Sequence, residues 1–156
     1  MIRYDRSPIY DKVEFLFVGN GSEAALVKRV CDECDNATFY DFMKPDEYDR
    51  LMSSCDVGIV SLDVRFTIPN YPSRLLSYLE NKMPVLCATD PNTDMGRIAE
   101  ENGYGFWCES VKPEDFTALV DKMLSADRKE MGEKGYEFLR KNYTVENTYN
   151  AVMQHF

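Results

Sequence analysis

Short apolar runs alternate along this chain with longer stretches in which apolar residues recur three and four positions apart. A nearly continuous apolar run of this kind is typical of a strand that is buried on both faces of a parallel sheet. The runs that predict strands span residues 13–18, 37–42, 57–62, 84–88 and 105–108.

The intervening stretches have helical spacing. In 72–82, for example, Leu75, Leu76 and Leu79 fall on one face of a helix. Proline opens several of these stretches, at a position where a helix tolerates the missing N–H. The predicted helices span residues 23–34, 45–55, 72–82, 93–102, 113–125, 128–142 and 145–155.

Strands that alternate with helices predict an α/β fold, namely a doubly wound, Rossmann-like parallel sheet with helices on both faces. Ligands of such folds bind at the carboxyl ends of the strands. The loops that follow strands should therefore open on one edge, and they span residues 19–22, 41–44, 61–71 and 89–94. No strand is predicted after residue 112, so we expect a helical tail that packs on the flank or reaches for a partner.

The chain has 156 residues, enough for one domain with a hydrophobic core but not for two of ordinary size. We expect a single Rossmann-like domain over 1–156, with 1–12 as a leader or remnant and 112–156 as the helical tail. The net charge of −9 argues against nucleic acid as a partner, because neutralising phosphates requires clustered Lys and Arg.

The N-terminal stretch MIRYDRSPIYDK lacks the apolar segment of a secretion signal. No apolar run approaches the roughly 20 residues that cross a bilayer. Five cysteines without a dense disulfide framework suit reduced thiols. We therefore expect a cytoplasmic protein, and any association with the inner face of a membrane to run through partners.

Metal and redox chemistry find little support in the sequence. Cys31 and Cys34 form a CxxC pair near the end of a predicted helix, where the helix dipole does not activate a thiol, and we interpret both as incidental. The chain has no second CxxC and a single histidine, His155, so we expect neither a zinc site nor a histidine relay. The acidic cluster in 89–94 is interpreted as a turn at Asp90-Pro91-Asn92, followed by a helix cap at Thr93 or Asp94. We expect no metal and no cofactor.

The most informative stretch is Asn70 to Ala88, which predicts a polar loop, a proline-started helix and a buried strand. Its Pro72-Ser73-Arg74 entry places backbone N–H groups, a hydroxyl and a guanidinium at one helix start. Such a group of donors suits an anion, for example a diphosphate. Ordinary helix capping by Ser73 and a surface position for Arg74 remain the alternative.

A rival motif lies earlier in the chain. Gly19-Asn20-Gly21 and Ala24 fit the G-x-G-x-x-[GA] dinucleotide fingerprint between a strand and a helix, and Asp41 ends the next strand as a ribose-binding acid would. This reading predicts an NAD(P)-binding module. The alternative is a tight strand-to-helix turn without a nucleotide.

Several blocks in this order resemble the C-terminal domain of GT-B glycosyltransferases of the family 4 type, with bacterial capsule, O-antigen and colanic-acid transferases the most similar. The matching blocks are FLFVGNGSE (15–23), MSSCDVGIVSL (52–62) and above all YPSRLLSYLENKMPVLCATDPNTDMGRIAEENGYGFWCE (71–109), followed by KPEDFTALVDKML (112–124). The resemblance covers most of the chain.

The resemblance implies a site for a nucleotide-diphosphate sugar of the UDP or GDP type. Asp41, Phe42 and Met43 would face the base, beside the turn at Asn20 and Gly21. Ser73 and Arg74 would meet the diphosphate, and the remaining residues implied at that helix start are Leu75 and Leu76, through their backbone N–H groups, and Ser77, on the ribose side.

The sequence departs from the family pattern in two places. The paired glutamates of the family would fall at Pro69 and Ser77, neither of which is acidic. The strand and helix that precede FLFVGNGSE in the family are not visible in 1–12, and no acceptor domain is present. We therefore expect a donor-binding fragment or subunit of a polysaccharide-building glycosyltransferase, inactive without its acceptor-binding N-terminal domain or subunit. An unpaired sheet edge would also permit a homodimer. A non-catalytic scaffold of the same fold is a further alternative.

Overall fold

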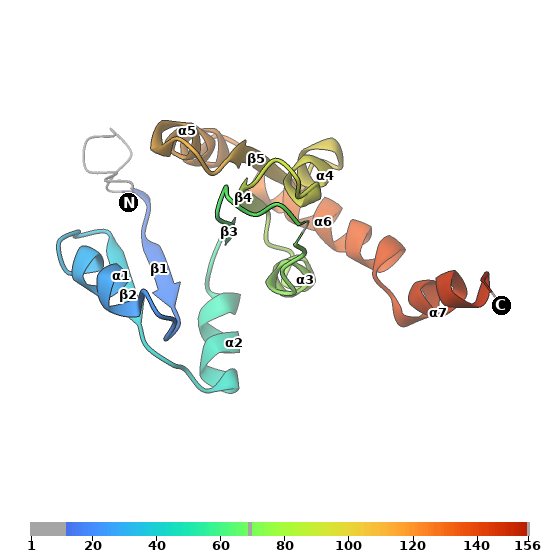
Figure 1. Ribbon diagram of the computed structural model, residues 1–156, viewed down its shortest axis with the longest axis horizontal. Coiled ribbons are helices and arrows are strands. Elements are labelled where there is room, and N and C mark those ends of the chain that lie inside the picture. The colour runs from blue at the N-terminus through green and yellow to red at the C-terminus, as the bar shows by residue number, and fades with distance from the viewer. Residues whose placement is uncertain (1–11, 69, 156) are drawn as a thin grey trace. The chain divides into compact units, whose positions relative to one another are not determined.

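The computed structural model describes residues 12–68 and 70–155, so Pro69 and most of the expected leader lie outside the described residues (Figure 1). Every predicted helix and strand is present, with ends that move by a few residues. In chain order the elements are β1 (Phe15–Val18), α1 (Ala24–Cys31), β2 (Ala37–Tyr40), α2 (Pro45–Ser53), β3 (Gly58–Ser61), α3 (Arg74–Glu80), β4 (Val85–Thr89), α4 (Met95–Glu101), β5 (Gly105–Glu109), α5 (Pro113–Leu124), α6 (Arg128–Asn142) and α7 (Val145–Met153).

The strands pair in parallel, which confirms the α/β, Rossmann-like fold class, but they form two sheets. One sheet contains β1 and β2, and the other has the order β3-β4-β5. The chain correspondingly forms two compact units, Met1–Ser53 and Ser54–Phe156, and each is described here by itself. The sequence pattern could not reveal this division, because hydrophobic periodicity reports burial and not the partner of each strand.

In the first unit, β1 and β2 are in register from Phe15 opposite Ala37 to Val18 opposite Tyr40. The ladder continues one step further, because the N–H of Gly19 donates to the carbonyl of Tyr40 at 3.1 Å. The turn after β1 and the residues after β2 therefore lie side by side. Helix α1 follows β1 and packs on β2.

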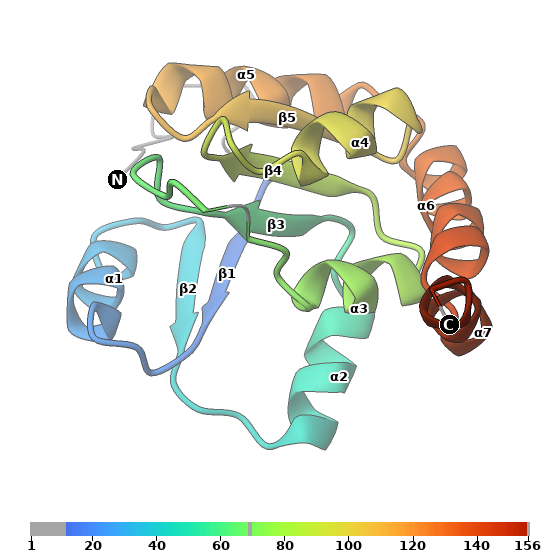
Figure 2. The ribbon, with the colours of Figure 1, turned by 45° about the vertical axis from the view of Figure 1, so that its right-hand side comes forward.

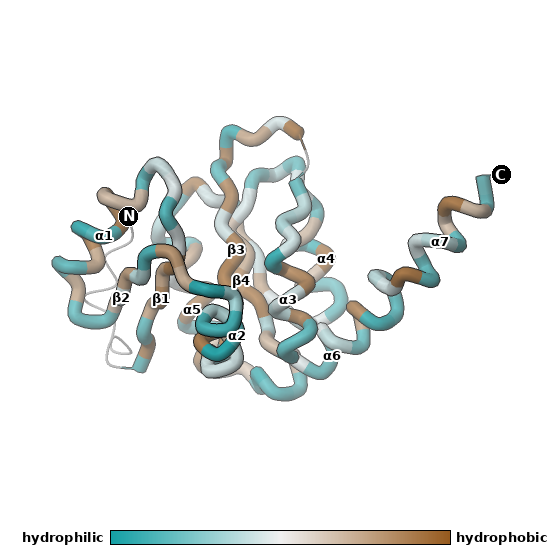
Figure 3. The backbone as a smooth tube through the Cα atoms, turned by 90° about the horizontal axis from the view of Figure 1, so that it is seen from below, coloured by the Kyte–Doolittle hydropathy of each residue, from teal (hydrophilic) through white to brown (hydrophobic). Residues whose placement is uncertain are grey.

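In the second unit, β4 is the central strand, and all five of its residues are buried. Figure 3 shows hydrophobic residues concentrated in β3 and β4. Helices α3, α4 and α6 contribute to a buried cluster on one face of this sheet, and α5 contacts β4 and β5 with the buried side chains Leu119, Val120 and Met123 (Figure 2). Helices therefore cover this sheet on both faces, as the near-continuous apolar strands predicted.

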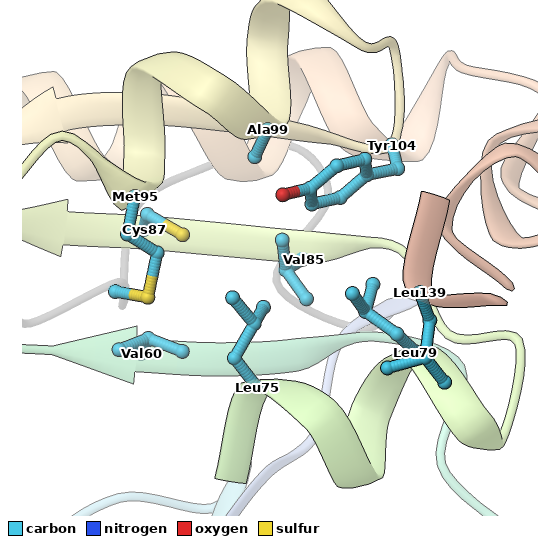
Figure 4. Close-up of a cluster of buried hydrophobic side chains, with 9 residues drawn as sticks. All are labelled: Val60, Leu75, Leu79, Val85, Cys87, Met95, Ala99, Tyr104 and Leu139. Carbon is cyan, nitrogen blue, oxygen red and sulfur yellow. The ribbon is translucent and has the colours of Figure 1, made fainter. Parts of the chain in front are cut away.

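The core of the second unit follows from the two periodicities of its elements. Val85 and Cys87 are two positions apart on β4 and point to the same face, where they meet Leu75 and Leu79, four apart on α3 (Figure 4). All four side chains are fully buried. Burial of each leucine contributes about 1.5–3 kcal/mol to folding. Burial also raises the pKa of the Cys87 thiol to about 12, so this cysteine is unreactive.

The three helices of the C-terminal tail differ in how much of their surface is buried. Helix α6 packs against α3, and α5 against the sheet, whereas no residue of α7 is buried. In the described part of the second unit, β3 and β5 are the edge strands of the sheet, and each hydrogen-bonds to β4. The homodimer through a sheet edge stays a prediction.

Candidate functional site

The loop between β3 and α3 carries the Pro72-Ser73-Arg74 motif and leaves the carboxyl end of β3. Residues 63–65, in the first part of this loop, are held in a turn by an ion pair between Asp63 and Arg65. Arg65 donates from its backbone N–H and from Nε to one carboxylate oxygen of Asp63, at 2.9 and 2.8 Å. The side-chain hydrogen bond from Arg65 lowers the pKa of Asp63 to about 2. Because both side chains are exposed, this pair shapes the loop and contributes little to stability.

The second part of the loop is attached to the turn that follows β4. Asn92 donates from Nδ2 to the carbonyl of Phe66 at 2.8 Å, and the N–H of Asn70 donates to Thr93 Oγ1 at 3.3 Å. The carboxyl ends of the neighbouring strands β3 and β4 thus meet through their loops. This attachment holds the chain immediately before the Pro72-Ser73-Arg74 motif.

A buried carboxylate organises the turn after β4. Asp90 Oδ1 accepts from the N–H groups of Asn92 and Thr93 at 2.9 and 3.0 Å, and its Oδ2 accepts from Thr93 Oγ1 at 2.8 Å. Burial alone raises the pKa of the Asp90 carboxyl, but the hydrogen bonds from Thr93 and Asn92 outweigh burial and hold the pKa below its ordinary value. The predicted turn is confirmed. Asp94 occupies the N-cap position of α4, as predicted, but its side chain makes no cap hydrogen bond.

The start of α3 differs from the expected arrangement of donors. Leu75 N–H donates to the carbonyl of Pro72 at 3.1 Å, and Leu76 N–H donates to that of Ser73 at 3.0 Å. Both amides therefore have acceptors already and are not free for an anion, contrary to the expectation for a regular first turn. The reason is a tight turn at Pro72 that delays the helix until Arg74.

The groups of this motif that remain available are side chains. Arg74 is exposed, and no carboxylate pairs with its guanidinium among the residues that the structure describes. Ser73 next to it is also exposed and makes no side-chain cap hydrogen bond. Ser77, one turn further along α3, is half-buried. An unpaired guanidinium beside a hydroxyl is suited to bind a phosphate oxygen pair.

The other predicted residues lie in the first unit, around the ends of β1 and β2. Asn20 and Gly21 are exposed in the turn before α1, which begins at Ala24. Asp41 accepts a hydrogen bond at Oδ1 from the N–H of Phe42 at 2.7 Å. The side chain of Phe42 is 73% exposed, and Met43 is half-buried. The strand–turn–helix context that the dinucleotide fingerprint requires is therefore present, although this context alone identifies no ligand.

The structure thus gathers the predicted residues in two groups. The first group, around Asn20 and Asp41, belongs to the unit Met1–Ser53. The second group, at residues 73–77, belongs to the unit Ser54–Phe156. Within each unit the residues lie at the carboxyl ends of parallel strands, as predicted from the loops that follow them.

A cavity of about 490 Å³ in the second unit lies elsewhere. Residues 55–56, 81–84 and 126–129 line it. These segments precede β3, β4 and α6, so the cavity is at the amino ends of the strands, away from the edge at which α/β folds bind ligands. None of the predicted site residues lines it.

The cysteines and acids of the described residues form no metal centre, since no group of three or more His, Cys, Asp or Glu side chains is placed to hold an ion there. Cys31 and Cys34 are both free thiols, and burial is the main cause that raises the pKa of Cys31. In the same residues, no helix is both long and apolar enough to cross a membrane.

Sequence reasoning missed the groups that hold the loop in place. The sequence predicts a turn at Asn92 and a helix cap at Thr93 or Asp94, and it marks Tyr71 only as the first residue of a matching block. Tyr71 in fact donates from its hydroxyl to the hydroxyl of Tyr143 at 2.7 Å. No local signal marks either contact, because the partners are 23 to 72 residues apart in sequence.

Comparison with known proteins agrees with the resemblance in the sequence. The family model described as "Glycosyl transferases group 1" matches residues 4–138. A protein from Pseudomonas aeruginosa called "Probable glycosyltransferase WbjE" is 24% identical over 136 residues. That alignment covers 86% of this chain and 34% of the relative, so the chain spans about a third of the relative's length.

Proposed function

Because the chain belongs to the group 1 glycosyl transferases, we propose that it is the part of such an enzyme that binds a nucleotide-diphosphate sugar. The sugar would pass from a UDP or GDP donor to a glycan or lipid-linked acceptor during polysaccharide synthesis, of the bacterial capsule, O-antigen or colanic-acid type. The single observation that carries the proposal is the exposed, unpaired guanidinium of Arg74 on a loop anchored at the carboxyl ends of β3 and β4.

The chemistry of the proposed site is charge stabilisation of the leaving diphosphate. Transfer of the sugar leaves negative charge on the diphosphate oxygens, and a guanidinium held nearby stabilises that charge as it develops. The guanidinium of Arg74 would make a bidentate interaction with two diphosphate oxygens, and Ser73 would donate a further hydrogen bond from its hydroxyl. The amides of Leu75 and Leu76 contribute less than the resemblance implied, because they already donate to Pro72 and Ser73.

Recognition of the nucleoside would fall to other residues. Ser77 stands where the family holds a ribose-binding glutamate, and a neutral hydroxyl binds a ribose hydroxyl more weakly than a carboxylate does. Asn20, Gly21 and the Asp41–Met43 segment are proposed for the base, as the resemblance implies. We further propose that catalysis requires an acceptor-binding domain or subunit, since the chain spans about a third of the relative's length. A lipid-linked acceptor would bring the assembly to the inner face of a membrane through its partners.

Calorimetric titration of the chain with UDP and GDP tests the proposal. Arg74→Ala should weaken binding of the diphosphate by about 10- to 100-fold, the usual effect of losing hydrogen bonds between charged groups. Arg97→Ala is the matched control, because Arg97 is an exposed arginine on α4 of the same unit. Absence of binding by every nucleotide at millimolar concentration would contradict the proposal. Tight NADH binding that Asp41→Ala abolishes would instead favour the dinucleotide reading, which uses Gly19, Gly21, Ala24 and Asp41.

A further inference from the structure

Tyr71 lies immediately before the Pro72-Ser73-Arg74 motif and joins it to a distant part of the chain. Its hydroxyl donates to the Tyr143 hydroxyl at 2.7 Å, and the two ring centroids are 5.6 Å apart. Tyr143 ends α6 at its C-cap position. A contact across 72 residues of sequence therefore connects the proposed diphosphate loop to the junction of α6 and α7.

Tyr143 is itself held by the core of the second unit. Its N–H donates to the carbonyl of Leu139 at 2.8 Å, and its ring meets Phe138 edge-on at 5.9 Å. Phe138 in turn lies 5.1 Å from the ring of Tyr104, which is fully buried. A series of aromatic rings thus extends from the core to Tyr143. Packing against this series restricts the position of the Tyr143 hydroxyl, which accepts from Tyr71.

The backbone between Tyr71 and Arg74 is restrained, so the position of Tyr71 affects the position of Arg74. Pro72 has a fixed φ angle and also restricts the backbone of Tyr71 before it. The carbonyl of Pro72 then accepts from the N–H of Leu75, which closes the turn. On the other side of Tyr71, the N–H of Asn70 is bound to Thr93 Oγ1. Little backbone freedom is left between the two tyrosines and the guanidinium.

We propose that Tyr143 is a positioning residue of the donor site, which acts through the Tyr71 hydroxyl to fix where Arg74 meets the diphosphate. This inference rests on the proposed function for the identity of the ligand. The contact itself does not depend on that function, so it is tested in the chain without ligand as well.

Tyr71→Phe and Tyr143→Phe each remove one hydroxyl and keep the ring. Without ligand, hydrogen exchange of the Asn70, Leu75 and Leu76 amides, which all have acceptors in this segment, should become about 3- to 10-fold faster in both variants, which corresponds to the loss of one hydrogen bond. Tyr149→Phe on α7 is the matched control, because this tyrosine is 62% exposed, and it should leave these amides unchanged. Unchanged exchange in Tyr143→Phe would overturn the inference.

The nucleotide measurements separate positioning from general stability. In both variants, affinity for UDP or GDP should fall about 3- to 10-fold while affinity for UMP or GMP changes little, because Arg74 is proposed to meet the diphosphate. The double variant should be no weaker than either single variant, since both remove the same hydrogen bond. Additive losses, or equal losses for monophosphates and diphosphates, would overturn the positioning role. If the unchanged chain binds no nucleotide, the proposed function fails, and hydrogen exchange alone decides whether Tyr143 holds the loop.

Discussion

Asp90 shows how one side chain arranges a whole loop region. Its carboxylate accepts from two backbone N–H groups and from the Thr93 hydroxyl, and the same hydroxyl accepts from the N–H of Asn70. The carboxylate therefore orients Thr93, and Thr93 holds the loop that leads to Arg74. The side chain of Asp90 is buried and satisfied by hydrogen bonds, so its ionised form is the one that the fold requires.

Asp90→Asn should lower the thermal midpoint at neutral pH, because an amide nitrogen replaces one accepting oxygen. The folded pKa of Asp90 lies below its ordinary value of 3.8, so its contribution to stability is complete above about pH 4 and is lost as the pH falls through the folded pKa. Thermal melts from pH 7 to pH 2.5 should therefore show the difference between variant and original shrinking only below about pH 4. Glu137→Gln, an exposed acid on α6, serves as the control. A difference independent of pH would contradict this account.

At the scale of the elements, α3 and α4 end in the same way with different residues. After α4, the N–H of Tyr104 donates to the carbonyl of Ala99, and that of Gly103 to Glu100, both at 3.0 Å. After α3, Met83 donates to Tyr78 and Lys82 to Leu79, also at 3.0 Å. Both ends are Schellman motifs, whose closing residue has a left-handed backbone. Gly103 has φ +69°, whereas the equivalent position after α3 is Lys82 with φ +54°.

A left-handed backbone at a residue with a Cβ atom costs about 1–2 kcal/mol, so Lys82→Gly should stabilise the fold. The substitution also removes the exposed ion pair between Lys82 Nζ and Glu133 at 2.9 Å, which contributes about 0–1 kcal/mol. Lys82→Ala loses the same ion pair and keeps the strained backbone, so it is the matched comparison. Urea unfolding should show Lys82→Gly more stable than Lys82→Ala by about 1 kcal/mol. Equal stabilities would mean that the backbone at residue 82 carries no strain.

At the scale of the whole molecule, buried apolar groups are unevenly divided. The main buried cluster draws all of its members from residues 60–139. Within the described residues of Met1–Ser53, the buried apolar side chains are Cys31 and Met52. A two-stranded sheet with little buried apolar area is marginal in isolation. The two units should therefore differ in stability.

We expect unfolding in urea to depend on the probe. Trp107, the only tryptophan, lies on β5 and reports on the second unit, whereas far-UV circular dichroism reports on the helices of both units. The dichroism signal should begin to fall at lower urea than the tryptophan fluorescence, because the first unit opens at lower free energy. Hydrogen exchange should be slowest for the amides of β4. Coincident transitions would show that the units unfold together.

The sequence alone determined the helices and strands, their order and the α/β class. These follow from local patterns, because an apolar run such as 84–88, or an apolar helical face such as that of Leu75 and Leu79, indicates which positions are buried. The same patterns, with the motif at Pro72-Ser73-Arg74, were enough for the family resemblance. Individual element ends differed from the pattern by a few residues, as at α3, where the turn at Pro72 delays the helix until Arg74.

The tertiary structure alone decided which segments meet. It showed that the strands pair as two sheets, that the turn at Asp90 holds the loop at Phe66 and Asn70, and that Tyr71 rests on Tyr143. It also showed that the amides of Leu75 and Leu76 are already occupied. Local patterns encode burial and backbone preference, but a contact between distant residues depends on how all elements pack at once. For that reason the positions of the candidate residues along the strands, loops and helices followed from the sequence, whereas the contacts that hold them did not.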